Sequence, residues 1–181
     1  RFTLLSMASP GTDVKLSEDR VKGYRNFLNK IWNANNFLIQ NDCKFENIET
    51  PNDLKLNINK WIFVEFTNTN EKIKKSIDSY RFDEAARIAY QFVWHSFCDW
   101  YLELSKTVFY SENNENIEET RNVASFIFTQ ILVILHPFIP FLTEEIWLKN
   151  KLDKDGKDFL MLKNWSEASS NKDKDLSLIH I

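Results

Sequence analysis

The stretch FDEAARIAYQFVWHSFCDWYLELSKTVFY, residues 82–110, determines the fold class of this chain. Its apolar residues return every three or four positions, which is the period of one helix face and not the alternation of a strand. They form one stripe along the whole stretch, at Phe82, Ala85, Ala86, Ala89, Val93, Phe97, Trp100, Tyr101, Leu104 and Val108. The spacing therefore predicts a long amphipathic helix over residues 82–110.

Two start signals mark helices before this stretch. Ser17 precedes two acidic residues and predicts a helix to about residue 41, because its hydroxyl can cap free amides and the acids favour the positive end of the helix dipole. Thr50 followed by Pro51 repeats the signal and predicts a second helix to about residue 79, with Thr50 as the cap and Pro51 at the first helical position.

Prolines separate the two helices that are predicted after residue 110. Apolar spacing predicts a fourth helix over residues 117–136 and a short fifth over 140–151, with Pro137 and Pro140 breaking the chain between them. In the tail, Phe159, Met161 and Trp165 are spaced as in an extended segment that lies on the bundle.

Composition agrees with an all-α fold. Only 3 Gly and 4 Pro occur in 181 residues, too few for the many turns of a sandwich or barrel. We expect an antiparallel helical bundle, in one main domain. The formal net charge of -3 does not suggest a protein that binds nucleic acid over its whole surface, so any RNA contact must come from a local patch.

Cysteines and apolar runs limit the class of protein further. Cys43 and Cys98 are far apart and in no zinc-binding spacing, which allows at most one disulfide and favours a reduced, cytoplasmic chain. Residues 122–143 carry no charge, but Gln130, His136 and two prolines favour a buried helix over a membrane span.

Three polar residues suggest chemistry at first sight. His95, Asp99 and Glu103 fall on one face of the predicted third helix and could hold a metal or act as acid and base. A metal site needs converging ligands from more than one element, and no partner cluster is evident, so a polar surface is favoured. With no Gly-x-Ser-x-Gly motif and no glycine-rich phosphate loop, we assign no catalytic residue and no metal ligand.

The aromatic residues have two interpretations. Tryptophans can stack on bases, but in a bundle of this size they more often fill the core, since burying such a ring stabilises the fold by roughly 1.5–3 kcal/mol. Core positions are therefore favoured for Trp32, Trp61, Phe92, Trp94, Trp100 and Trp147.

One row on the predicted first helix has the composition of an RNA contact. Its members are Arg25, Asn29, Lys30, Asn33, Asn36 and Phe37. Asparagine is a poor helix former, and its amide can pair with base edges, while Arg and Lys meet phosphates and an aromatic ring stacks on an unpaired base. A solvated face, with Asn29 or Asn33 bonded to its own backbone, remains the alternative.

Two motifs, in this order and about a hundred residues apart, resemble a known family. Residues 27–37 read FLNKIWNANNF and residues 136–147 read HPFIPFLTEEIW. With FCDWYLE at 97–103, they resemble the anticodon-binding domain of class Ia aminoacyl-tRNA synthetases, and within that class the valyl family. The isoleucyl and leucyl families are the first alternative, and a helical protein-interaction module without an RNA role is the second. Asn36 departs from the valyl pattern, which usually has Arg there, so the resemblance carries no contact over to position 36.

The resemblance implies a division of the chain and a function. Residues 1–16 would end the stem-contact region, 17–151 form the anticodon-binding bundle and 152–175 an extended tail, while residues 176–181 read like a translated sequencing adapter. The whole enzyme would activate valine with ATP and Mg and transfer it to valine tRNA, as a cytoplasmic monomer without a membrane anchor. The ATP-handling signatures do not occur in this chain, which would hold no cofactor itself and would position the tRNA.

Overall fold

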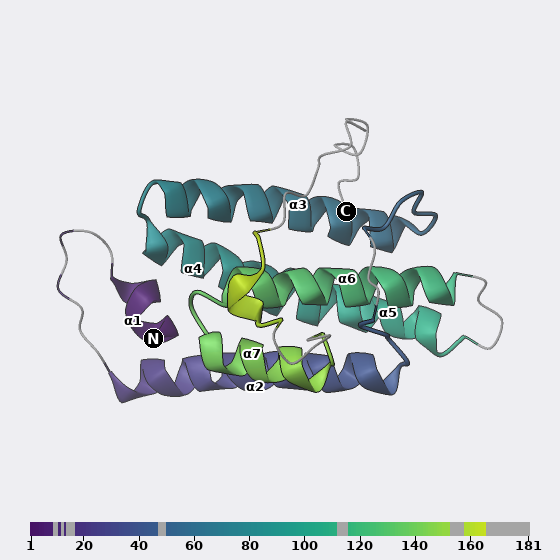
Figure 1. Ribbon diagram of the computed structural model, residues 1–181, viewed down its shortest axis with the longest axis horizontal. Helices are drawn as coiled ribbons and strands as arrows, with labels where there is room; N and C mark the ends of the chain where they lie inside the picture. The colour runs from purple at the N-terminus through teal and green to yellow at the C-terminus, as the bar shows by residue number, and fades with distance from the viewer. Residues whose placement is uncertain are drawn as a thin grey trace.

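The computed structural model describes residues 1–8, 11, 13, 17–46, 50–111, 116–152 and 158–165. All regular structure within these ranges is helical, which confirms the all-α prediction (Figure 1). The elements are α1 (Phe2–Met7), α2 (Glu18–Gln40), α3 (Asn57–Asp78), α4 (Phe82–Gln91), the π-helical η1 (Phe92–Tyr101), α5 (Leu102–Phe109), α6 (Ile117–Leu135), α7 (Pro140–Lys149) and the 3-10 turn η2 (Leu160–Leu162).

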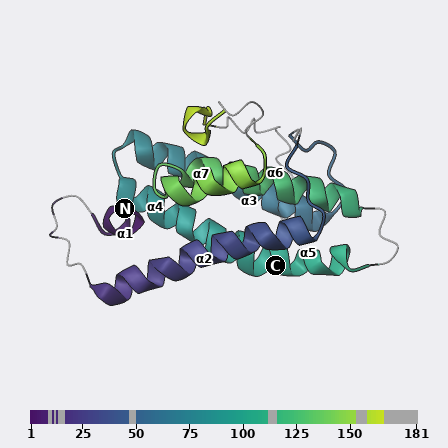
Figure 2. The same cartoon turned by 60° about the horizontal axis from the view of Figure 1, so that its bottom comes forward.

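Four rods form an up-down-up-down bundle, in which α4, η1 and α5 make one continuous rod (Figures 1 and 2). This rod is parallel to α2, because Phe27 contacts Trp94 and, further along, Phe37 contacts Phe109. Contacts of α3 with the continuous rod run in the opposite order. α6 begins near the end of α2, where Arg121 donates to the carbonyl of Asn41, and runs back along it (Figure 1). α2 and the continuous rod therefore lie side by side and point the same way.

The uncharged run at residues 122–143 is explained by burial. Most residues of α6 are inaccessible to solvent, Val123, Ile127 and Ile131 completely so. Within the described ranges, no helix has the length and apolarity that a membrane crossing requires. The prolines after α6 turn the chain, and α7 begins with Pro140 in its first turn, as predicted.

The start of α3 corrects one prediction. Ser17 caps α2 as expected, with its hydroxyl accepting from the N–H of Arg20 at 3.4 Å. The signal at Thr50 and Pro51 is not used, and α3 begins only at Asn57. A carboxylate from another helix replaces the local cap, since Glu119 of α6 accepts from the N–H groups before that helix.

The π-helical segment corrects the predicted stripe. Its hydrogen bonds span five residues, so it turns less per residue than an α-helix and the apolar face loses its register. Trp100 is 62% exposed and Leu104 45% exposed, although both belong to the stripe expected to be buried. The other tryptophans of the predicted core lie against it, with Trp147 buried and Trp32, Trp61 and Trp94 partly buried.

The tail also differs from its prediction where it is described. A 3-10 turn occupies Leu160–Leu162, so these residues are not extended. Leu160 packs into the core at 2% exposure, while Met161 is 70% exposed. Residues 153–157 and 166–181, with the predicted adapter sequence at 176–181, lie outside the described residues.

Candidate functional site

The outward face of α2 presents three members of the predicted row to solvent. Arg25, Asn29 and Asn33 are exposed. In the described part of the chain, their side chains make no hydrogen bond or ion pair, so the alternative in which Asn29 or Asn33 bonds to its own backbone is not observed. These side chains can meet a ligand without breaking a contact of the fold.

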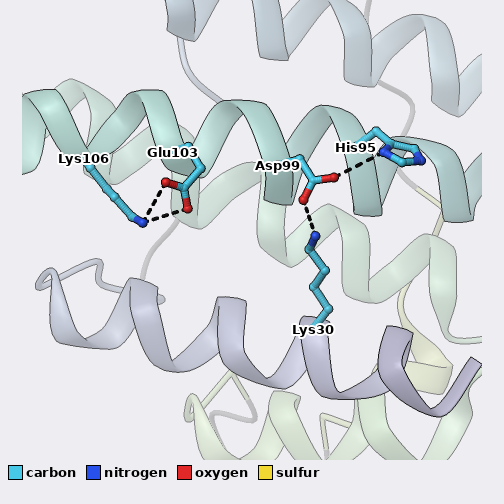
Figure 3. Close-up of polar contacts among 5 residues, drawn as sticks. All are labelled: Lys30, His95, Asp99, Glu103 and Lys106. Carbon is cyan, nitrogen blue, oxygen red and sulfur yellow. Dashed lines mark hydrogen bonds and ion pairs between the residues drawn. The ribbon is translucent and has the colours of Figure 1, made fainter. Parts of the chain in front are cut away.

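Lys30 is less available to a ligand than these three residues, because it is paired within the fold. Its Nζ forms an ion pair with Asp99 of η1 (Figure 3). The same ammonium lies 4.3 Å from the centroid of the Trp94 ring. The other carboxylate oxygen of Asp99 lies 3.2 Å from Nδ1 of His95. Asp99 thus holds a lysine from α2 and a histidine from its own helix at the same time.

Phe37 continues the same side of α2 and is half-buried. Its ring contacts Phe109 with centroids 6.1 Å apart, and the ammonium of Lys106 lies 5.7 Å from its centroid. Lys106 is in turn paired with Glu103 at 2.7 Å (Figure 3). Stacking of a base on Phe37 would have to use the part of the ring that these neighbours leave open.

Asn36 faces α7 instead of the continuous rod. Its Oδ1 accepts from Nζ of Lys149 at 3.4 Å, and the same ammonium lies 4.3 Å from the centroid of the Trp32 ring. One residue earlier, the buried Asn35 accepts from Nδ2 of Asn150 at 2.7 Å. The row therefore divides into three solvent-facing residues and three that also contact neighbouring helices.

We name the surface between α2 and the continuous rod the polar seam, formed by Lys30, Asn33, His95, Asp99, Glu103 and Lys106. Asn33 shares this side of α2 because it follows Lys30 by three residues. The two lysines of the seam are neutralised by its two carboxylates. The seam therefore offers hydrogen-bonding groups more than net positive charge.

The polar trio His95, Asp99 and Glu103 has structural partners. His95, Asp99 and Glu103 lie on one face as predicted (Figure 3), and each has a polar neighbour of the fold. Among the residues that the structure describes, no three His, Cys, Asp or Glu side chains converge as a metal site would require. The polar-surface interpretation is favoured.

Lys106 and Lys149 were missed by sequence reasoning. Both ammonium groups lie over aromatic rings of α2, Phe37 and Trp32 respectively. No local pattern signals such a contact, because the partners are far apart in the sequence and meet only in the bundle.

The cysteines carry no reactive chemistry. Cys43 and Cys98 are free and buried, and burial raises the pKa of each thiol to about 12. Both remain protonated at neutral pH, and a protonated thiol is neither a good nucleophile nor a metal ligand.

Comparison with known proteins identifies the family. A model of the anticodon-binding domain of tRNA ligase matches residues 59–180. The chain is 63% identical to the valine--tRNA ligase of Pelagibacter ubique over 179 residues, which cover 99% of the chain and 20% of that protein. It is 41% identical to that of Agrobacterium fabrum over 174 residues (96% and 18%) and 45% identical to that of Buchnera aphidicola over 170 residues (92% and 18%).

The chain spans about a fifth of the length of these relatives. The matches favour the valyl pattern over the isoleucyl and leucyl alternatives. The row on α2 lies before the range of the family model, which therefore does not test its role. The chain belongs to the family of anticodon-binding domains of tRNA ligases, in the form that occurs within valine--tRNA ligases.

Proposed function

We propose that this chain binds the anticodon arm of valine tRNA through α2 and the polar seam, and so positions the tRNA for a ligase of which it is one part. The observation that carries the proposal is the solvent-facing pair formed by Asn33 of the seam and Asn29, one turn before it. An amide offers one donor and one acceptor in a single plane, which matches the edge of adenine. Valine anticodons share A and C at their second and third positions.

The charge of the seam supports base reading over general attraction to phosphates. Lys30 and Lys106 are each paired within the fold, and only Arg25 in the row is a cation without such a pair in the described ranges. Affinity for the RNA backbone at this surface is therefore modest, and discrimination comes from side chains that meet bases.

The rest of the reaction belongs to the longer protein. We propose that the whole ligase activates valine with ATP and Mg and transfers it to tRNA, as a monomer in the cytoplasm. We propose that ATP and Mg bind to other parts of that ligase. The chain by itself should show no valine-dependent pyrophosphate exchange.

Titration of labelled tRNA at two salt concentrations tests the role of the amides. Asn33→Ala or Asn29→Ala should reduce discrimination between valine and non-valine anticodons by about 1–3 kcal/mol and leave the salt dependence unchanged. Asn68→Ala, at an exposed asparagine of α3, is the matched control. Equal discrimination by all of these proteins would assign recognition to another surface.

A further inference from the structure

A second polar feature lies at one end of the bundle. A cleft of about 430 Å³ opens where α1, the start of α2 and α4 meet, the region at which α1 joins the bundle in Figure 1. This volume is within the range of clefts that bind small groups. None of its lining residues belongs to the predicted row.

Two arginines from different helices are among the residues that line the cleft. Arg20 comes from α2 and Arg87 from α4. Arg87 lies 3.8 Å from a carboxylate oxygen of Glu84 and donates to Gln91 at 3.3 Å, which holds its side chain along α4. Arg20 has no side-chain ion pair in the described ranges. In a chain of net charge -3, two arginines on one cleft favour an anionic ligand, and a guanidinium fits phosphate oxygens through two parallel hydrogen bonds.

The remaining wall is aromatic. Phe2, Tyr24 and Tyr90 line it and contact one another, with centroids 5.0 Å apart for Phe2 and Tyr24 and 6.1 Å apart for the two tyrosines. Burial raises the pKa of Tyr90, so its hydroxyl stays protonated and can donate a hydrogen bond at neutral pH.

The cleft is aligned with the polar seam. Gly23, Lys30 and Phe37 follow one another at seven-residue intervals, which is close to two helical turns, so they share one side of α2. Gly23 lines the cleft, whereas Lys30 and Phe37 contact the continuous rod further along. At about 1.5 Å per residue, Gly23 lies roughly 10 Å from Lys30 along the helix.

We propose that the cleft binds a backbone phosphodiester of the RNA whose bases are read at the polar seam, with Arg20 and Arg87 as its ligands. The proposal rests on the proposed function and adds a second contact to it. One RNA strand lying along the surface between α2 and the continuous rod would reach both places, which favours RNA over a free phosphate ion. The cleft would supply the phosphate affinity that the neutralised seam does not.

Substitutions at Gly23 test whether a negative charge in the cleft weakens binding of RNA. A Cβ built on this glycine has no heavy atom within 4 Å outside its own helix surroundings, so a side chain can begin here without a clash at its first carbon. With a valine tRNA transcript at about 0.1 M salt, Gly23→Glu should bind at least about fivefold more weakly than the isosteric Gly23→Gln and with a salt slope about 0.7 smaller. Lys74→Gln, which removes an exposed cation on α3, should leave the slope unchanged.

A cysteine at the same position reports whether RNA enters the cleft. The native thiols are buried and protonated, so Gly23→Cys supplies a thiol that alone should react readily with a maleimide. Valine tRNA should slow this reaction several-fold, while inorganic phosphate at the same phosphate concentration should not.

The outcomes separate this inference from the proposed function. Phosphate binding in the cleft would be contradicted if Gly23→Glu and Gly23→Gln bound tRNA equally, or if tRNA did not slow the maleimide reaction. Neither result would affect the role proposed for Asn29 and Asn33. Loss of binding in Gly23→Glu, with unchanged discrimination in the asparagine variants, would support the cleft and contradict base reading at the seam. A thiol at position 23 that is unreactive without RNA would show that other parts of the chain fill the cleft, and would also overturn the inference.

Discussion

The two sides of the continuous rod carry hydrogen-bonded clusters that differ in burial. On the inner side, the hydroxyl of Tyr101 donates to Oδ1 of Asn59 at 3.0 Å, and Nδ2 of Asn59 donates to Glu119 and Thr120. On the outer side, Asp99 holds Lys30 and His95 (Figure 3). Tyr101 and Asn59 are 0% exposed, whereas the side chain of Asp99 is 39% exposed.

This difference assigns the clusters to separate tasks. A buried polar group that loses its partner cannot turn to water, so the inner cluster stabilises one arrangement of α3, η1 and α6. An exposed pair is screened and exchanges easily with solvent, so the outer cluster adds little stability and can exchange partners with a ligand. Polar side chains therefore hold the fold on one side of the rod and remain available for binding on the other.

Removal of the central amide should break the inner cluster and give the largest effect. Asn59→Ala leaves the Tyr101 hydroxyl without its main acceptor and Glu119 without one donor. We expect the free energy of unfolding to fall by about 2–3 kcal/mol, measured from urea denaturation. Asn68→Ala, at an exposed position of the same helix, should change it by less than about 0.5 kcal/mol. A cost for Asn59→Ala as small as that of the control would contradict the structural role of the cluster.

Glu119 lies at the edge of the inner cluster, and its contribution to stability should depend on pH. Burial by itself raises the pKa of a carboxyl group, but hydrogen bonds from Asn59 and from the N–H groups of Lys55 and Leu56 hold the pKa of Glu119 below its ordinary value. Its contribution is thus complete at neutral pH and is lost as the pH falls through the lowered pKa.

Glu119→Gln isolates this contribution. At pH 7 the variant should be less stable by about 1 kcal/mol, the usual size of a lost helix cap, and it should lose less stability than the wild type on acidification to about pH 3. Glu118→Gln removes an exposed partner of Arg121 and serves as the control. Parallel acid profiles for wild type and Glu119→Gln would show that this carboxylate does not cap α3.

On the outer side, Asp99→Asn should change stability by less than about 1 kcal/mol, because both partners are partly solvated. Its effect on RNA should be clearer, since an uncharged amide no longer neutralises Lys30. If the proposed function holds, valine tRNA should bind more tightly with a salt slope steeper by about 0.7.

Glu103→Gln should act in the same way as Asp99→Asn, because it removes the carboxylate that pairs with Lys106. Tighter binding and a steeper salt slope in both variants would show that the two carboxylates of the seam limit its affinity for phosphate. Weaker binding in Asp99→Asn alone would mean instead that Asp99 positions Lys30 for the RNA.

Much of the fold was predictable because its signals are local. The period of the apolar residues predicts the helices at 18–40, 82–109 and 117–135, since an amphipathic face must be buried wherever the helix packs. Ser17 caps its own helix through the N–H of Arg20, and Pro140 begins α7, so both act within a few residues of themselves.

The candidate site was predictable only as a set of residues. The sequence indicates which side of α2 carries Arg25, Asn29 and Asn33, because helical spacing determines it. It does not indicate that Lys30 is neutralised, because its partner Asp99 lies 69 residues away. Whether a lysine can meet a phosphate depends on that partner.

By itself, then, the sequence determined the helical class of the chain, much of the apolar face that its helices bury and the family to which it belongs. Only the tertiary structure decided that α3 begins at Asn57, that Trp100 is exposed and that the cations of the seam are paired. The physical reason is the distance along the sequence over which each interaction acts. Periodicity and capping act over a few residues of one helix, whereas the carboxylate of Glu119, the phase of η1 and the charge on Asp99 act between helices that meet only when the bundle forms.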